Sequence, residues 1–372
     1  RCKGQCRYLA AAMLRLQQIS LLQFKNYQHR QFRFTERVTG ICGSNGAGKT
    51  NLLDAIHYLC FTRSYFGRLD AGHVLHGASG FRIEGHFSTE QEEEKAVCIL
   101  RETGRKEFLV NETAYDKFSR HIGRYPAVVI APDDASLITG SSEFRRKFLD
   151  ALLSQLDADY LQALITYSKV LLQRNSLLKS FADSGNRNEK LLEVLDEQLA
   201  APGDLIFEKR KSFLTHFLPG VVHLYKEIAG KTEPVNLFYE SELIEQNMTT
   251  LLQANRQKDL YTQRTVSGIH KDELDIQMGS QPFKQIASQG QRKSLLFALK
   301  LAEMEILRKE KGFAPLLLLD DVFEKLDEQR IANLLHKVCV ENDGQVFITD
   351  TDPVRLTAQL KQLGIGFEII GV

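Results

Sequence analysis

One eight-residue segment limits the folds open to this chain more than any other feature. It has the spacing G-x-x-x-x-G-K-[ST] and consists of Gly43, Ser44, Asn45, Gly46, Ala47, Gly48, Lys49 and Thr50. Residues 38–42, just before it, have the pattern of a buried strand, and residues 51–60, just after it, have the apolar spacing of a helix. A strand, this loop and a helix in succession are the context that a P-loop requires.

The residue types in the loop suit a phosphate-binding site. Glycines let backbone N–H groups approach phosphate oxygens closely, and the N-terminal end of the following helix carries a partial positive charge. Lys49 would bridge the outer phosphates, and the Thr50 hydroxyl would ligate Mg²⁺. The loop therefore predicts binding of a nucleoside triphosphate. The alternative is a glycine-rich turn that matches by chance, and the flanking strand and helix argue against it.

A second candidate site follows an apolar run near the end of the chain. Four leucines, residues 316–319, precede Asp320 and Asp321. A strand buried on both faces is continuously apolar, and ligands bind at the carboxyl ends of such strands. Asp320 would hold Mg²⁺ directly or through water, and Asp321 would orient or polarise an attacking water. The alternative is an Asp pair that caps the following turn.

A third candidate site is the segment Ser288, Gln289, Gly290 and Gln291, which begins a predicted helix over residues 289–311. A serine hydroxyl and glycine amides at a helix N-terminus can bind an anion such as a phosphate. Alone, the segment would be interpreted as a capped helix start. Its position between the P-loop and the acidic strand favours the phosphate-binding interpretation.

The order of predicted elements divides the chain. Strands predominate up to residue 130, helical spacing fills residues 141–230, and strands return at residues 235–239 and 273–278. Glycine and proline predict helix breaks at residues 183–186, 201–203 and 218–220, which excludes a long coiled-coil rod. We expect an α/β fold with a mixed sheet and flanking helices, divided into an extension (1–12), the first part of the P-loop lobe (13–135), an inserted, mainly helical lobe (136–265) and the rest of the P-loop lobe (266–372).

Composition narrows the class of protein. The chain has 372 residues, 43% of them hydrophobic, and a net charge of +1, which neither supports nor excludes a nucleic-acid partner. Its six cysteines form no C-x-x-C pair, so we expect no zinc site, no disulfide framework and a cytoplasmic location. The longest apolar runs have the length of strands, so no membrane partner is expected. We expect Met13 to be the natural start.

The order of P-loop, helical insertion, S-x-G-Q segment and acidic strand, followed by Leu326 and Asp327 as a D-loop, resembles an ABC-type ATPase head. Within that class the chain resembles the RecF family of bacterial recombination mediators over residues 13–372. The resemblance rests on five motifs: F-K-N-Y at 24–27, A-P-D-D at 131–134, R-R-K-F-L-D at 145–150, G-I-H-K-D-E-L at 268–274 and A-S-Q-G-Q at 287–291.

This resemblance implies a function in recombinational repair and the processing of replication gaps. ATP and Mg²⁺ would bind at the P-loop of one subunit, and Ser288 of a second subunit would close the site. The resulting homodimer would bind duplex DNA near single-strand gaps and would work with RecR and RecO in loading a recombinase. Lys25 and Asn26 of the F-K-N-Y motif, and Arg63 as the basic residue expected nearest the nucleotide, are candidates for contacts with DNA or nucleotide.

Two departures from related patterns bear on the chemistry. Transporter-type ABC heads carry Glu after the first acid and His after the next strand, where this chain has Asp321 and Thr349-Asp350. We therefore expect a weak ATPase, stimulated by DNA, in which binding is the working signal. In the G-x-H motif of the family, Ile269 replaces the expected proline and Lys271 replaces the expected arginine, which weakens any role assigned to that loop.

Basic clusters and rival functions complete the expectations. The clusters are Arg63 with Arg68, Arg101 with Arg105 and Lys106, Lys117 with Arg120 and Arg124, and residues 209–211. Most charge runs of this kind are only solvated surface.

A transporter ATPase subunit is an alternative function, and the large helical lobe and the missing His argue against it. An ABC-type ATPase of phage defence is another, opposed by the short segment after the final predicted strand.

Overall fold

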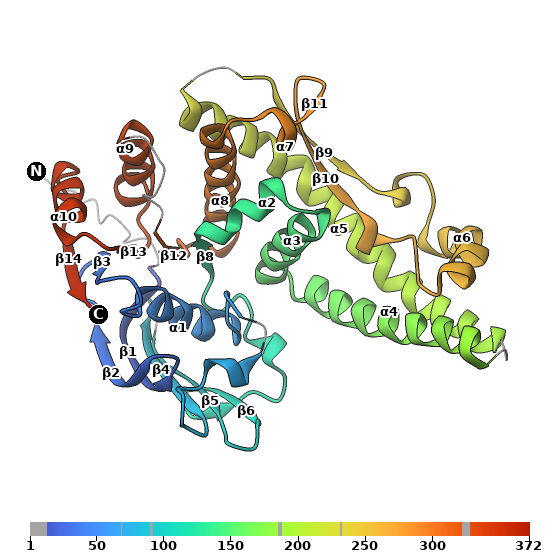
Figure 1. Cartoon of the computed structure of the whole chain (residues 1–372), viewed down its shortest axis with the longest axis horizontal. Coiled ribbons are helices and arrows are strands. Elements are labelled where there is room, and N and C mark those ends of the chain that lie inside the picture. Colours follow the sequence, from blue (N-terminus) through green and yellow to red (C-terminus); the bar gives the residue numbers. More distant parts are fainter. Residues whose placement is uncertain (1–12, 68, 90–91, 185–187, 231–232, 322–327) are drawn as a thin grey trace, which may run out of the picture. The chain divides into compact units, whose positions relative to one another are not determined.

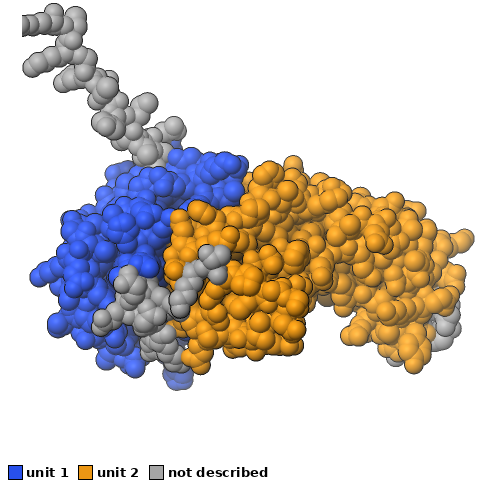
Figure 2. All heavy atoms as spheres, turned by 90° about the horizontal axis from the view of Figure 1, so that it is seen from above, with its two compact units in different colours: residues 1–132, 303–372 blue, residues 133–302 orange. Residues whose placement is uncertain are grey.

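The computed structural model describes residues 13–67, 69–89, 92–184, 188–230, 233–321 and 328–372. The chain forms two compact units (Figure 2). Unit 1 comprises residues 1–132 and 303–372, and unit 2 comprises residues 133–302. The extension 1–12 and the proposed D-loop residue Asp327 lie outside the described residues, as does Arg68.

Unit 1 contains a five-stranded parallel sheet with the strand order β14-β3-β13-β12-β8 (Figure 1). Every residue of the inner strands β3, β13 and β12 and of the edge strand β8 is buried. A parallel sheet is covered on both faces, which explains this burial. The bounds are β3 Val38–Cys42, β8 Ala127–Ile130, β12 Leu316–Leu319, β13 Val346–Asp350 and β14 Phe367–Gly371.

A six-stranded antiparallel sheet with the order β2-β1-β4-β5-β6-β7 completes the strands of unit 1. Its strands are β1 Arg15–Phe24, β2 Tyr27–Arg33, β4 Phe81–Ser88, β5 Glu93–Leu100, β6 Lys106–Val110 and β7 Thr113–Ala114. In β4, buried and half-buried residues alternate, as expected for a strand with one face on the core. Helix α1, Lys49–Phe61, contacts strands of both sheets, and almost its whole length is buried. The core of unit 1 therefore holds the P-loop helix between strands of the two sheets.

The C-terminal part of unit 1 adds two helices. Helix α9 is Glu328–His336 and continues into a wider turn over Lys337–Glu341. Helix α10, Pro353–Gln362, was not expected at all. Asp352 accepts hydrogen bonds from the backbone N–H groups of Val354 and Arg355, and Pro353 occupies the first turn, where it needs no N–H partner.

Unit 2 is mainly helical. It contains α2 Ala135–Thr139, α3 Ser142–Leu156, α4 Ala158–Ser184, α5 Glu189–Ala229, α6 Met248–Thr262, α7 Phe283–Ile286 and the start of α8 Gln289–Lys311. A small antiparallel sheet has the order β11-β10-β9, with β9 Val235–Glu240, β10 Glu273–Met278 and β11 Gln281–Pro282. Helix α8 has the bounds that the sequence predicted, whereas α6 was missed.

The predicted breaks at residues 201–203 and 218–220 are wrong, because α5 runs through Pro202 and Pro219. A proline in a helix costs roughly 3 kcal/mol. Leu199 and Ile206, on either side of Pro202, are fully buried, and each such side chain returns about 2 kcal/mol. At 41 residues the helix spans about 60 Å. Burial of one face thus outweighs the local preference for a break.

The division between the units also differs from the expected boundary at residue 265, because unit 2 continues to Ala302. Strand β10 explains the difference. It pairs antiparallel with β9 from Glu273↔Glu240 to Met278↔Val235, so it belongs to the same sheet. Arg145 of α3 adds an ion pair with Glu273 at 2.8 Å. Residues 266–302 are therefore part of unit 2 rather than of the P-loop lobe.

Two buried arginines hold the helices of unit 2 together. Arg210 of α5 lies 2.7 Å from both Asp150 of α3 and Asp272. Arg174 of α4 lies 2.6 Å from Asp196 of α5 and 2.6 Å from Asp259 of α6. Burial raises the pKa of Asp259, so its negative charge depends on the arginine beside it. Each arginine thus links elements that are distant in the sequence.

Replacing Arg174 by methionine should strongly destabilise unit 2. The substitution keeps most of the side-chain volume but leaves Asp259 buried without its cation, which typically costs about 3–5 kcal/mol. Urea unfolding followed by circular dichroism measures the loss. Arg256→Met is the matched control, since Arg256 pairs with the same Asp196 but keeps 26% of its side chain exposed, and it should cost at most about 1 kcal/mol. Equal losses in both variants would contradict this account.

Candidate functional site

The loop between β3 and α1 has a backbone that needs glycine. Gly46 has φ +80° and Gly48 has φ +122°, both in the region that other residues adopt only with strain. A Cβ atom on Gly48 would lie 2.6 Å from Asn26 Nδ2 and 2.8 Å from the Tyr27 hydroxyl. Gly48 is thus fixed by close packing as well as by its backbone angle.

Lys49 lies back over the loop that precedes it. Its side chain is 4% exposed, and Nζ donates to the carbonyl oxygens of Gly43 at 3.0 Å and Ser44 at 3.2 Å. The cation therefore sits against the loop formed by the first residues of the motif. This is the place from which a lysine of a P-loop reaches phosphate oxygens.

The F-K-N-Y motif at the β1–β2 turn supports the loop. Asn26 Nδ2 donates to the Ala47 carbonyl at 2.8 Å, and Asn26 Oδ1 accepts from Asn51 Nδ2 at 2.7 Å. The Tyr27 hydroxyl donates to the Gly48 carbonyl at 3.0 Å. The sequence suggested Asn26 as a contact for DNA or nucleotide, and the structure shows a direct role in bracing the P-loop.

The two other suggested contact residues differ in their surroundings. Lys25 forms an ion pair with the buried Asp54 of α1 at 2.6 Å, so its charge is already matched. Arg63 is exposed just beyond the C-terminal end of α1, and its carbonyl oxygen lies 2.9 Å from His57 Nδ1. Their roles as contacts stay predictions, and the exposed Arg63 is better placed for one than Lys25.

Asp320 meets the P-loop residue Thr50 at the carboxyl edge of the parallel sheet. Thr50 Oγ1 lies 2.9 Å from Asp320 Oδ2 and 3.1 Å from Oδ1. On the other side, Thr349 of β13 donates to Asp320 Oδ1 at 2.8 Å. Burial raises the pKa of Asp320, while the hydrogen bonds from the two threonines act in the opposite direction. The hydroxyl and carboxylate that the sequence assigned to Mg²⁺ are thus adjacent.

Asp321 follows in an unusual backbone conformation. Its φ is +44°, in the left-handed region that Asp tolerates better than most residues. Its backbone N–H donates to Thr349 Oγ1 at 2.9 Å. Sequence reasoning noticed Thr349 only as a residue in place of a histidine and missed its contacts with both acidic residues.

The S-x-G-Q segment belongs to unit 2. The backbone N–H of Ser288 donates to Gln291 Oε1 at 2.7 Å, and the Ser288 hydroxyl accepts from the backbone N–H of Gln291 at 3.3 Å. This reciprocal pair is a capping box at the start of α8. Ser288 and Gln289 are exposed. The capped helix start is therefore observed, and phosphate binding by the segment stays a prediction.

Most of the basic clusters are matched by acidic partners. Arg101 and Arg105 contact Glu107, Arg120 contacts Asp116, and Arg124 contacts Glu94. In the cluster at residues 209–211, Lys209 pairs with Asp157, Arg210 is buried, and Lys211 lies over the ring of Phe207. Arg210 is the buried member of these clusters, whereas Arg101, Arg105 and Arg120 are exposed and pair with acidic neighbours at the surface.

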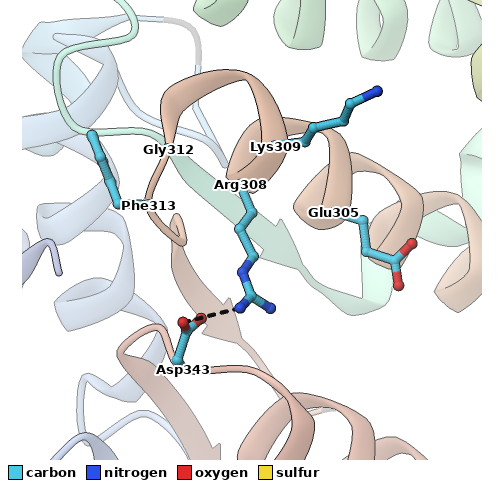
Figure 3. Close-up of a pocket in the computed structure, with 6 residues that line it drawn as sticks. All are labelled: Glu305, Arg308, Lys309, Gly312, Phe313 and Asp343. Carbon is cyan, nitrogen blue, oxygen red and sulfur yellow. Dashed lines mark hydrogen bonds and ion pairs between the residues drawn. The ribbon is translucent and has the colours of Figure 1, made fainter. Parts of the chain in front are cut away.

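A surface pocket of about 320 Å³ lies elsewhere in unit 1, and its residues come from the C-terminal end of α8 and the turn before β13 (Figure 3). Arg308 points to Asp343, with 3.0 Å between Nη2 and Oδ2. These residues precede β12 and β13, whereas ligands of parallel sheets bind beyond the carboxyl ends of the strands. The pocket is therefore separate from the P-loop site. Its lining residues are Glu305, Arg308, Lys309, Gly312, Phe313 and Asp343.

The described residues offer neither a metal cluster nor a membrane-spanning helix. Across the described ranges, no cluster of three or more His, Cys, Asp or Glu side chains has the arrangement of a metal site. In the same part of the chain, no helix combines the length and apolar content that crossing a membrane requires.

His270, which belongs to the G-I-H-K motif, is partly buried. Its Nδ1 lies 2.8 Å from the Tyr167 hydroxyl, and burial lowers the pKa of His270 to about 4.

Comparison with known proteins decides between the classes of P-loop protein. Residues 15–368 match the family model of the RecF/RecN/SMC N terminal domain. DNA replication and repair protein RecF of Flavobacterium johnsoniae is 44% identical over 359 residues, which cover 96% of this chain and 100% of that protein. The chain belongs to the RecF family. The RecF protein of Phocaeicola vulgatus is 40% identical, with 96% of both chains covered.

Solved structures give the same result for the fold. A structure of the recombination mediator protein RecF with ATP, from the RecFOR pathway, has a TM-score of 0.85 and 31% identity, and covers 93% of this chain and 94% of that one. The Smc head domain of Pyrococcus furiosus has a TM-score of 0.53 at 17% identity and shares the fold. The predicted resemblance to the RecF family and the predicted ABC-type head fold are confirmed.

Replacing Asp320 by asparagine should stabilise the protein in the absence of nucleotide. A carboxyl whose pKa is raised by folding favours the folded state below its unfolded pKa, and that contribution is lost as the pH rises through the folded pKa. At pH 7 the buried charge therefore opposes folding, and an amide removes it. Thermal unfolding should show a higher Tm at pH 7 and a smaller difference near pH 4. Asp343→Asn, at an exposed pair with Arg308, is the control and should not raise the Tm.

Proposed function

We propose that this chain is an ATP-dependent DNA-binding protein of recombinational repair and replication-gap processing, acting in the cytoplasm. The observation that carries the proposal is the junction of Lys49, Thr50 and Asp320 at the carboxyl edge of the parallel sheet. Membership of the RecF family links this nucleotide site to DNA, since relatives of 44% and 40% identity are named DNA replication and repair proteins.

The residues around the loop fit ATP. The loop from Gly43 to Thr50 has open space at Gly46, where a Cβ atom would have no neighbour within 4 Å, so a phosphate can approach the backbone there. Lys49 can exchange its two carbonyl partners for phosphate oxygens without leaving the loop. The solved RecF structures were obtained with ATP and an ATP analogue, which supports ATP as the nucleotide here.

The same junction fits Mg²⁺. Thr50 Oγ1 and the Asp320 carboxylate would hold the ion, because hydroxyl and carboxylate oxygens are the ligands that Mg²⁺ prefers. When bound, Mg²⁺ neutralises charge on the phosphate oxygens. Thr349 and Thr50 keep the carboxylate oriented by donating to it. Asp321, which we propose as the residue that orients water, has a shorter side chain than the Glu of faster ABC-type heads, so hydrolysis should be slow.

Dimer formation supplies the switch in this proposal. ATP on the P-loop of one copy would be closed by Ser288, Gln289, Gly290 and Gln291 of a second copy, and the D-loop residue Asp327 belongs to the same proposal. Ser288 and Gln289 are exposed, and the capping box leaves the serine hydroxyl one further lone pair and its proton. The ATP-bound dimer would bind duplex DNA near single-strand gaps, and DNA would stimulate slow hydrolysis.

Family membership also suggests the protein partners. The solved relatives are described as recombination mediators of the RecFOR pathway. We propose that this chain acts with RecR-like and RecO-like proteins and assists the loading of a recombinase on gapped DNA. Contacts by Lys25, Asn26 and Arg63 with nucleotide or DNA belong to this proposal, and Asn26 and Arg63 are the exposed members of the three.

Two variants should separate the roles within the site. Lys49→Met removes the cation that contacts the phosphates, so it should abolish ATP binding, ATP-dependent dimerisation and DNA binding. Asp321→Asn keeps a residue that tolerates positive φ, so it should bind ATP and stay dimeric while hydrolysing it at least tenfold more slowly. Sedimentation and duplex-DNA binding, with and without ATP, measure these effects. Wild-type behaviour of both variants would refute the assigned roles.

The salt dependence of DNA binding gives an independent test. A dimer that neutralises about six phosphates should lose roughly a thousandfold in affinity between 50 and 200 mM salt. Fluorescence anisotropy with a labelled duplex and saturating ATP measures the slope. An affinity that does not change with salt would rule out binding to the phosphate backbone.

A further inference from the structure

We propose that Thr349 is a positioning residue whose hydroxyl, anchored on the Asp320 carboxylate, holds the backbone of Asp321 in place at the nucleotide site. The expected effect of Thr349 on hydrolysis rests on the proposed function. The hydrogen bonds that place Thr349 between the two acidic residues do not depend on it. Thr349 occupies the region in which transporter-type ABC heads carry a histidine. In this chain its hydroxyl contacts the Asp320 carboxylate and the Asp321 backbone.

The position of Thr349 in the sheet explains how it can reach both residues. Strand β13 lies between β3, which leads into the P-loop, and β12, which leads into Asp320. In the register, Thr349 is opposite Ile41 of β3, and Ile348 is opposite Leu319 of β12. Asp320, which follows Leu319, therefore lies beside Thr349 at the carboxyl edge of the sheet. Thr349 is 0% exposed there, so water does not compete for its hydroxyl.

The hydrogen bonds of the hydroxyl have a fixed direction. A threonine hydroxyl has one proton and two lone pairs. A backbone N–H can only donate, so the bond of 2.9 Å from Asp321 N uses a lone pair of Thr349 Oγ1. The proton is then available for Asp320 Oδ1 at 2.8 Å. One hydroxyl thus joins the carboxylate of Asp320 to the backbone of Asp321.

Asp321 gives this link its importance. Its φ of +44° lies in the left-handed region, which is strained for an L-residue, so the backbone favours relaxation wherever a restraint is lost. The hydrogen bond to Thr349 is a restraint at the residue itself. Without it, the backbone of Asp321 loses one restraint, and we expect its side chain to shift from the position in which it would orient water.

The competing explanation is packing. A β-branched residue suits a buried central strand, and in that case valine would serve as well as threonine. Thr349→Val removes the hydroxyl but keeps the shape, whereas Thr349→Ser keeps the hydroxyl but removes a methyl group. The two explanations therefore predict opposite orders for the two variants.

The experiment compares wild type, Thr349→Val and Thr349→Ser as full-length proteins. Steady-state hydrolysis of Mg·ATP with DNA gives kcat and KM, and a fluorescent ATP analogue gives the nucleotide Kd. Hydrogen exchange at the Asp321 amide, followed by mass spectrometry without nucleotide, reads the restraint directly. We expect Thr349→Val to lower kcat about tenfold, with KM and Kd within about twofold, and to exchange the Asp321 amide faster. Thr349→Ser should resemble wild type in all of these.

Three results would overturn the inference: equal kcat in Thr349→Val and wild type, a loss in Thr349→Ser as large as in Thr349→Val, or unchanged exchange at the Asp321 amide in Thr349→Val. Failure of the proposed function looks different, because wild type would then neither bind nor hydrolyse ATP. In that event the amide exchange of the three proteins still decides whether the Thr349 hydroxyl positions Asp321.

Discussion

The buried carboxylate of Asp320, held between two threonines, is the constraint on which the nucleotide site depends. Its donors come from α1, the helix that follows the P-loop, and from β13, the strand beside its own. A carboxylate at 3% exposure is costly unless such donors surround it. Three segments far apart in the sequence must therefore meet at one edge of the parallel sheet. Because burial raises the pKa of Asp320, we expect the arrangement to cost stability in the nucleotide-free protein, in return for the proposed site for Mg²⁺ and phosphate.

Unit 2 uses buried charge in another way. Arg210 joins Asp150 of the R-R-K-F-L-D motif to Asp272 of the G-I-H-K-D-E-L motif, so two motifs that identify the family meet in one ion-pair network. Arg174 does the same for α4, α5 and α6. Both motifs are rich in charged residues. In this fold their charges are largely satisfied internally, and they specify how the helices pack.

The sequence predicted best what local spacing determines. Strands with continuous apolar runs, such as β3 and β12, and helix α8 had the expected bounds, because burial on both faces or a capped start leaves a clear local signal. Tertiary burial carried α5 through Pro202 and Pro219, which no local preference predicts. The short break at Asp157 and the helix after Asp352 did have signals, since both aspartates cap helices. Within the site, Thr50 and Asp320 were predicted as partners, but the link from Thr349 depends on strand order.

The central claim is that Thr50 and Asp320 form one Mg²⁺-dependent nucleotide site. Calorimetric titration of ATP, with and without Mg²⁺, into wild type, Thr50→Val and Thr50→Ser tests it most directly. The account predicts that Mg²⁺ tightens ATP binding at least tenfold in wild type and in Thr50→Ser, and that this gain is lost in Thr50→Val. An equal gain in Thr50→Val, or no effect of Mg²⁺ on wild type, would contradict it.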